Sequence, residues 1–214
     1  MADNYLEKKF EEFHSGRSQS PKHKPVAGNL SLDSLLLKNR SYRGFDSSVQ
    51  VSIEELQQIA KVCTKIPSAK NQQVLRLKLV AGEDTPRLQQ YTKWGGALPE
   101  LNLPFKGTEP SAFIIICSTV AENKWVDIDL GIAAQSMLLK AVEMGLNGIC
   151  IGAFNKAEVT SEFALPYEPV LVLAIGKGAE NIQLTHVREG ESQTYYRKNG
   201  VHFVPKLGLE DLIL

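Results

Sequence analysis

Residues 126–154 read VDIDLGIAAQSMLLKAVEMGLNGICIGAF, and the rest of the chain can be arranged around this stretch. Between Leu130 and Met144 only five residues are not plainly apolar, so a helix here is apolar on almost every face. Such a helix is buried in a protein core or in a membrane, and polar residues interrupt this one too often for a span of ~20 residues. The stretch therefore predicts a core helix.

A short strand is predicted directly after this helix. Gly145 and Gly148 end the helix, and the apolar run GICIGAF continues to a turn of small residues at Gly152 and Ala153. The backbone N–H groups of such a turn can face a flat or anionic ligand. The same stretch is equally consistent with a core helix and a core strand joined by an ordinary loop.

The charge of the chain argues against two classes of partner. Its 214 residues contain 24 Lys plus Arg and 24 Asp plus Glu, which give a formal net charge of zero. Without a basic excess we expect neither nucleic acid nor an anionic membrane as a partner. The N-terminal sequence MADNYLEKKFEEFHSGRS is charged throughout and lacks the apolar core of a signal peptide, which favours a cytoplasmic protein.

The cysteines and histidines indicate neither a disulfide framework nor a metal site. The three cysteines, Cys63, Cys117 and Cys150, form no CxxC pair and lie in apolar surroundings, so reduced, buried thiols are expected. The four histidines are scattered without the spacing of metal ligands, so we expect no metal site.

The length suits one domain with an N-terminal arm. Residues 1–28 are expected to form the arm, with a short amphipathic helix at YLEKKFEEF, and residues 29–214 the main domain. A helix over 30–38 has Ser31 as its cap candidate, and Ser52 opens another helix with Glu55 in a capping box. Further helices are expected over 86–94 and after Asn155, strands over 74–80, 112–118 and 170–176, and a hairpin turn at Asn199-Gly200.

Two polar stretches carry the candidate binding residues. In NRSYRGF, residues 39–45, Arg40, Ser41 and Arg43 place two guanidinium groups and a hydroxyl within a few residues. Both arginines could reach one extended anionic ligand, because guanidinium groups suit phosphate oxygens and carbonyl edges. Two exposed arginines are the alternative interpretation. In PSAKNQQ, residues 67–73, hydroxyl and amide side chains suit a heterocycle or a polyol.

The order of these stretches resembles the nitroreductase family of FMN-dependent oxidoreductases. The family's first motif, Arg-Arg-Ser-x-Arg-x-Phe, is matched by residues 39–45, and its second, Pro-Ser-x-x-Asn-x-Gln-Pro-Trp, by Pro67, Ser68, Asn71 and Gln73. The buried helix leading to GICIGAF and the C-terminal VPK, which ends at Lys206, follow in family order. The similarity runs from about Leu30 to the C-terminus, and the arm resembles that of a bacterial subgroup.

The resemblance implies an α+β fold with a mostly antiparallel central sheet flanked by helices, in an intertwined homodimer with FMN at the interface. It also implies electron transfer from NAD(P)H, through the flavin, to nitroaromatic, quinone or related small acceptors by a ping-pong mechanism. The resemblance places a variable substrate lid around residues 86–110. No side chain needs to act as an acid or base, so no catalytic residue is predicted.

By analogy with the family, FMN is held at several points. Arg40 and Ser41 belong to the phosphate and ribityl end, with Lys206 as a C-terminal phosphate ligand, and Arg43 lies near N1 and O2 of the ring. Ser68, Ala69 and Asn71 come from the partner subunit, and the amides around Gly152 and Ala153 face N5 and O4. The complete predicted set is Asn39, Arg40, Ser41, Arg43, Pro67, Ser68, Ala69, Asn71, Gly152, Ala153 and Lys206.

Departures from the family pattern leave other functions open. Asn39 replaces the usual first arginine, and Leu207-Gly208 replaces a basic residue that often follows the C-terminal lysine. Both changes remove positive charge from the phosphate end. Val74 and Leu75 stand where the second motif has Pro-Trp. A flavin-binding protein of the same fold with little turnover is one alternative, and a specialised dehalogenase or flavin-cleaving member is another.

Overall fold

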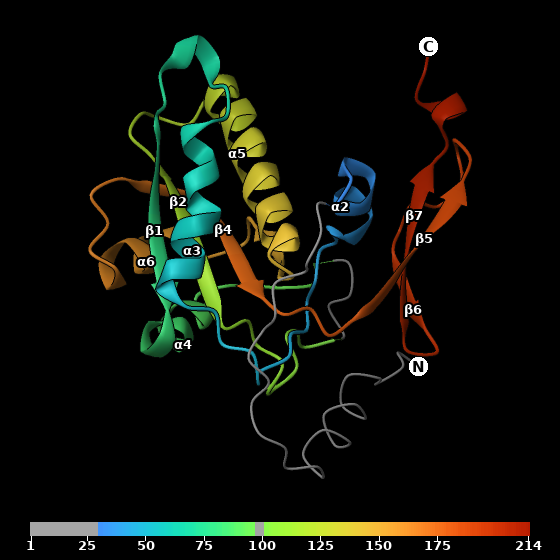
Figure 1. The fold of residues 1–214 in the computed structure, drawn as a ribbon, viewed down its shortest axis with the longest axis horizontal. Helices are drawn as coiled ribbons and strands as arrows, with labels where there is room; N and C mark the ends of the chain where they lie inside the picture. The colour runs from blue at the N-terminus through green and yellow to red at the C-terminus, as the bar shows by residue number, and fades with distance from the viewer. Residues whose placement is uncertain (1–29, 97–100) are drawn as a thin grey trace.

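The computed structural model of the chain describes residues 30–96 and 101–214 (Figure 1). The predicted arm, residues 1–28, lies outside the described residues, as does part of the predicted lid, so the arm and its boundary stay predictions. In the described part, helices pack on a four-stranded sheet, and the C-terminal segment forms a separate three-stranded sheet.

The central sheet is antiparallel throughout. Its strands lie in the order β1 (Leu75–Ala81), β2 (Ala112–Ser118), β4 (Glu168–Gly176) and β3 (Asn147–Ile151). The strands predicted over 74–80, 112–118 and 170–176 are confirmed within two residues at each end, and the strand predicted after the core helix is β3.

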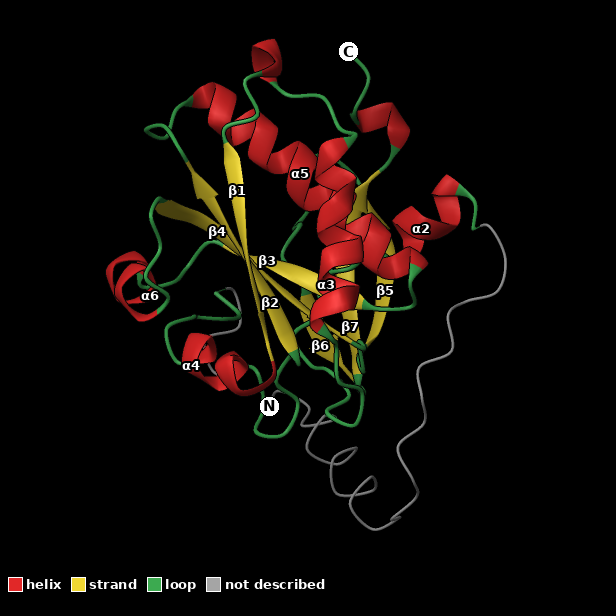
Figure 2. Cartoon of the chain, turned by 60° about the vertical axis from the view of Figure 1, so that its left-hand side comes forward, coloured by secondary structure: helices red, strands yellow, loops and turns green. Residues whose placement is uncertain are grey.

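Alternate residues of β2 face two separate parts of the core. Ile114 and Ile116 pack in the cluster that α3 (Ile53–Ala60) and α5 (Lys124–Glu143) build on one face of the sheet. Phe113 and Ile115 pack in the cluster that includes residues of α4 (Thr85–Gln89) and α6 (Lys156–Glu162) on the other face (Figure 2). Because helices cover both faces, β2 is buried along its whole length and lacks the polar alternation of a half-exposed strand.

The predicted core helix is α5. Asn123 caps its N-terminus by accepting hydrogen bonds from the amides of Trp125 and Val126, and Gly145, with φ 78°, follows its end. Cover on nearly every face is confirmed over residues 130–144, where the exposed residues are Gly131, Gln135 and Glu143, but in the N-terminal turns before this range Trp125 and Ile128 are each 50% exposed. The core lies on the opposite flank of these turns, where Val126 is buried.

The predicted helix caps are confirmed, and one predicted helix is shorter than expected. Ser31 caps α2 (Leu32–Lys38), Ser52 and Glu55 form a capping box on α3, and Asn155 caps α6. α4 ends at Gln89 rather than near residue 94, because residues 91–93 extend and pair with 153–155 through the Thr92–Phe154 bridge. The described 3-10 helices are η1 (Lys61–Thr64), η2 (Ala69–Asn71), η3 (Gly82–Asp84) and η4 (Leu209–Asp211).

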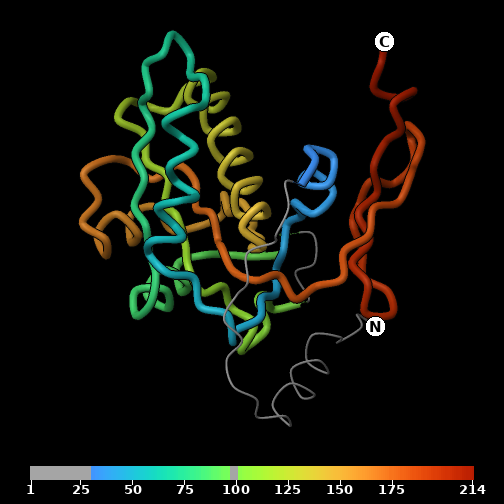
Figure 3. The backbone as a smooth tube through the Cα atoms, in the orientation of Figure 1, coloured from blue at the N-terminus to red at the C-terminus, as the bar shows by residue number. Residues whose placement is uncertain are grey.

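The C-terminal sheet stands apart from the central sheet, and the chain crosses from one to the other after β4 (Figure 3). Its order is β5 (Asn181–Val187), β7 (Val201–Leu207) and β6 (Tyr196–Lys198), with β5 parallel and β6 antiparallel to β7. The predicted hairpin turn joins β6 to β7, where Asn199 and Gly200 have φ of 50° and 76°. The strand β5 was not predicted from the sequence.

The prediction of buried thiols is wrong for one cysteine. Cys117 is buried on β2 and Cys63 is partly buried, but Cys150 is exposed because its side chain leaves the edge strand β3 toward a cavity. Among the described residues, no helix is long and apolar enough to cross a bilayer, and no group of three or more His, Cys, Asp or Glu could hold a metal ion.

Candidate functional site

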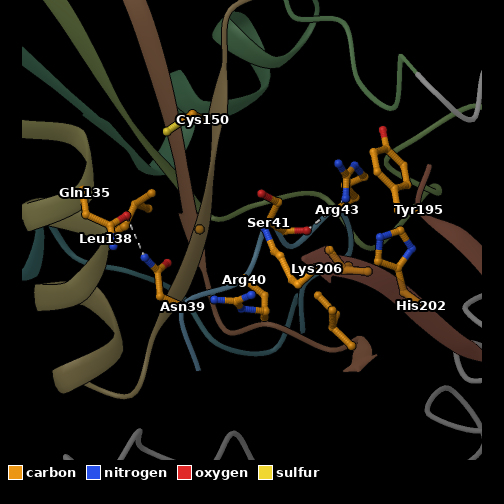
Figure 4. Close-up of a pocket in the computed structure, with 13 residues that line it drawn as sticks. Asn39, Arg40, Ser41, Arg43, Gln135, Leu138, Cys150, Tyr195, His202 and Lys206 are labelled. Atoms are coloured by element: carbon orange, nitrogen blue, oxygen red, sulfur yellow. Dashed lines mark hydrogen bonds between the residues drawn. The ribbon is translucent and has the colours of Figure 1, made fainter. Parts of the chain in front are cut away.

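A cavity of about 320 Å³ lies between the body of the protein and the C-terminal sheet (Figure 4). The predicted first motif, the helix α5 and the strand β3 line it on one side, and the C-terminal sheet with the segment before β6 lines the other. The lining residues are Asn39, Arg40, Ser41, Arg43, Gln135, Leu138, Gly148, Cys150, Ile182, Tyr195, His202, Val204 and Lys206. Residues from both ends of the described chain therefore meet at one site.

Backbone pairing with β3 fixes the first motif along this cavity. Ser41 forms a parallel bridge with Gly148, and the amide of Tyr42 donates to the carbonyl of Gly148 at 3.2 Å. A side chain at Gly148 would bring its Cβ to 2.5 Å from the carbonyl oxygen of Ala174, so this close approach needs glycine. The side-chain amide of Asn39 donates to the side-chain oxygen of Gln135 on α5 at 3.1 Å.

The two arginines of the motif are not free surface side chains. Arg43 is only 8% exposed; its Nη1 donates to the Ser41 carbonyl at 3.1 Å, and its guanidinium lies 4.7 Å from the centre of the Tyr195 ring. Arg40 is partly buried and donates to the Leu36 carbonyl at 2.6 Å. The alternative of two exposed arginines is therefore wrong.

Half of the buried side-chain polar atoms that lack a hydrogen-bond partner, among the described residues, belong to residues that line this cavity. Among the described residues, six buried side-chain nitrogens and oxygens lack a hydrogen-bond partner, and three of them, in Arg40, Arg43 and His202, belong to lining residues. Burial lowers the pKa of His202 to about 4, with the charges of Arg43 and Arg197 adding to the effect, so its imidazole is neutral at pH 7. A buried polar group without a partner is costly, so the cavity suits a ligand that is rich in hydrogen-bond acceptors.

Lys206, another of the predicted site residues, lines the same cavity from β7. Figure 4 shows Arg43, Tyr195 and His202 together at one end, Asn39 with Gln135 at the other, and Arg40, Ser41 and Lys206 between them. These labelled residues come from sequence positions that span most of the described chain.

The predicted turn at Gly152 and Ala153 follows β3 directly, beyond the cavity-lining Cys150. Both residues are exposed, and a Cβ added to Gly152 would meet no atom within 4 Å. The Ala153 carbonyl accepts from the amide of Lys93 at 2.8 Å, so the turn is held from the side of α4. Ala153 lines a second, more open hollow with Gln90, Tyr91, Lys93, Phe154 and Asn155.

The second motif does not line this cavity within one chain. Pro67, Ser68, Ala69 and Asn71 precede or form η2, and the Ala69 amide donates at 2.8 Å to Asp129 near the start of α5. Asp129 lies about 9 Å along the helix axis from the level of Gln135, which lines the cavity. The expectation that the partner subunit supplies these residues stays a prediction.

Sequence reasoning missed Tyr195, His202 and Gln135 as lining residues. A signal existed for His202, since side chains on a strand alternate between faces and His202, Val204 and Lys206 share the face of β7 that lines the cavity. No such signal marks Tyr195, which lies just outside β6.

Comparison with known proteins decides the family. The model of the nitroreductase family matches residues 36–177, which include both motifs, α5 and β3. The chain belongs to the nitroreductase family. The match ends before β5, so Tyr195, His202 and Lys206 lie beyond it. A comparison with curated proteins finds no match.

Solved structures from this family share the fold. An FMN-dependent nitroreductase from Clostridium difficile is 25% identical, with a TM-score of 0.57 over 70% of this chain and 89% of that chain. A protein assigned as a nitroreductase from Exiguobacterium sibiricum, in complex with FMN, is 21% identical, with a TM-score of 0.58 over 71% and 90%. A protein assigned as an NAD(P)H:FMN oxidoreductase from Staphylococcus epidermidis is 20% identical, with a TM-score of 0.59 over 74% and 92%.

The family and the α+β fold with an antiparallel central sheet, both predicted from the sequence, are confirmed. Membership of this family makes the chain an FMN-dependent oxidoreductase.

Proposed function

We propose that this nitroreductase takes electrons from NAD(P)H and passes them to nitroaromatic, quinone or related small acceptors, with donor and acceptor occupying the same place in turn. The observation that carries the proposal is the convergence of Arg40, Arg43 and Lys206 on one cavity, where the buried Nε atoms of both arginines lack hydrogen-bond partners. A ligand with an anionic end and a carbonyl-rich edge satisfies both features, and FMN has both.

The cavity residues have distinct tasks in this proposal. Arg40, Ser41 and Lys206 would hold the phosphate and ribityl end, and Arg43 would bind the electron-rich edge of the ring. FMN supplies the hydride-transfer chemistry when bound, and the protein supplies orientation and electrostatics. The amides of Gly152 and Ala153 would bind the opposite edge without a side chain in the way. Asn39 contributes no charge and already donates to Gln135, which leaves two cations for the phosphate.

We propose a homodimer as the working form, with residues 29–214 as its cofactor-binding domain and residues 1–28 as an arm. A volume of about 320 Å³ lies at the lower end of the range for ligand pockets, roughly 300–1,000 Å³. A partner subunit would complete the site with Ser68, Ala69 and Asn71. Apolar side chains that need cover stand exposed on α2 and the C-terminal tail: Leu32, Leu36, Leu37, Leu209, Leu212, Ile213 and Leu214.

An absorption spectrum of the purified protein tests the proposal first. We expect a bound yellow flavin that NADH or NADPH bleaches under anaerobic conditions and that a quinone or nitroaromatic acceptor restores. Light scattering coupled to size exclusion should give twice the mass of one chain. A colourless protein that takes up no added FMN would refute the proposal.

The loss of phosphate charge at Asn39 favours a second candidate, a flavin-binding protein of this fold with little turnover. The same mixing experiment separates the two, because in this second case the flavin stays yellow for minutes after NADH or NADPH is added. A test with both nucleotides is needed, since the sequence does not choose between them.

A further inference from the structure

A buried carboxylate lies behind the cavity wall and belongs to none of the predicted site residues. The side chain of Glu180, in the link between β4 and β5, is 2% exposed. Its Oε2 accepts from the backbone amide of Arg43 and, at 3.1 Å, from that of Gly44. Its Oε1 accepts from the Arg197 guanidinium on β6. One carboxylate thus binds the first motif and the C-terminal sheet together.

The charges around Glu180 do not cancel. Two buried guanidinium groups, those of Arg43 and Arg197, face the single carboxyl of Glu180, whose pKa burial raises and Arg197 and Arg43 lower, and His202 is neutral at pH 7. Arg197 forms its ion pair with Glu180, whereas the Arg43 side chain donates to the Ser41 carbonyl and lies over the Tyr195 ring. Of these two buried arginines, Arg43 is the one without a direct ion pair among the described residues, and it lines the cavity.

The segment that carries Glu180 is fastened to the motif along its length. The Asp46 amide donates to the Lys177 carbonyl at 2.8 Å, and the Ala179 amide donates to the Gly44 carbonyl at 3.0 Å. Phe45 forms an isolated antiparallel β-bridge with Gly178. A Cβ added at Gly178 would lie 2.3 Å from the Tyr42 ring, well inside van der Waals contact. These backbone hydrogen bonds bring Glu180 to the amides of Arg43 and Gly44, so the carboxylate fixes the backbone at the C-terminal end of the motif.

We propose that Glu180 is a positioning residue for the flavin site: it fixes the backbone at Arg43 and, through Arg197, holds the C-terminal sheet against the cavity, so that the Arg43 guanidinium faces the ligand. This inference rests on the proposed function, in which the ligand is FMN. Glutamate suits the role because both oxygens only accept. Glutamine would turn an NH₂ group toward the motif amides or toward the guanidinium, where only donors stand.

The test is a double-mutant cycle on FMN affinity, measured by titration of flavin fluorescence. Glu180→Gln should weaken FMN binding about tenfold to a hundredfold, the range expected for losing hydrogen bonds to a charged group. In an Arg43→Ala background the same change should weaken FMN binding clearly less than in the parent protein, because the part that Glu180 exerts through the Arg43 guanidinium is already lost, while the part through Arg197 and the C-terminal sheet remains. Glu210→Gln, which removes an exposed carboxylate bonded to Arg188, is the matched control and should bind FMN like the parent protein.

Equal losses in the two backgrounds, or no loss for Glu180→Gln, would overturn the proposal. If the Gln variant fails to fold, Glu180→Asp takes its place, because it keeps the carboxylate on a side chain one methylene shorter. Full parental FMN affinity of the Asp variant would show that the length of the side chain is irrelevant and would also overturn the proposal. If the parent protein binds no FMN, the proposed function fails by itself. Amide hydrogen exchange then decides the role of Glu180: faster exchange at Arg43, Gly44 and β6 supports it, and unchanged exchange refutes it.

Discussion

Replacing Arg43 by alanine should lower the two-electron midpoint potential of bound FMN. Reduced flavin carries negative charge at its N1–C2=O edge, and a cation there stabilises the reduced form. Because Arg43 is 8% exposed, water screens this interaction little. A hydrogen bond to a charged group contributes about 1.5–3 kcal/mol. For a two-electron couple, 30 mV corresponds to about 1.4 kcal/mol, so Arg43→Ala should lower the potential by roughly 30–65 mV.

The potential is measured by anaerobic titration of the holoprotein against a reference dye. Arg188→Ala is the matched control, since the Arg188 side chain is 61% exposed and bonds Glu210 at the far end of β5. The control should keep the parental potential, and Arg43→Lys should keep part of the difference. If Arg43→Ala holds FMN at the parental potential, Arg43 does not contact the ring and the assignment of the cavity is wrong.

Two further predictions concern stability. Gly148→Ala should lower the free energy of unfolding by about 1–3 kcal/mol, because the new Cβ would lie 2.5 Å from the Ala174 carbonyl oxygen. Gly131→Ala on α5, where a new Cβ meets no atom within 4 Å, should raise it by up to about 1 kcal/mol. Urea titration of both variants checks this difference, and equal effects would contradict it. The pKa of His202 is about 4 when folded and about 6.5 when unfolded, so the unfolded chain binds the proton first and stability should fall by up to about 3 kcal/mol between pH 7 and pH 4. A His202→Gln variant should lose this contribution, and unfolding curves that keep the parental pH dependence would refute it.

Most of the helices, strands and turns that were predicted correctly have their signal in residues close together in the sequence. The capping box of Ser52 and Glu55 involves residues close in sequence, as does the turn at Asn199-Gly200, so each is readable without knowledge of the fold. Long apolar runs such as residues 112–118 mark a strand covered on both faces. β5 gave no such signal, because its side chains are mostly exposed and its pairing with β7 is set from a distance. α4 ends early for a similar reason, since pairing with 153–155 overrides its propensity.

The family motifs name several residues that line the candidate site, and their binding roles stay predictions. The placement of Arg40, Arg43 and Lys206 on one cavity agrees with the motif analogy. The contact between Glu180 and Arg43 was not predictable, because it joins residues 137 apart that no local pattern links. Ser68 and its neighbours lie away from the cavity within one chain, and their contribution from a partner subunit stays a prediction.

The separation of Glu180 from Arg43 also has a consequence during synthesis. A ribosome adds about 5–20 residues per second, so the motif at Arg43 waits roughly 7–27 s for the carboxylate that anchors its amides. Arg197, His202 and Lys206 are translated later still. Until these residues are synthesised the cavity lacks the side that the C-terminal sheet lines, so we expect the proposed flavin site to form only after Lys206 has left the ribosome.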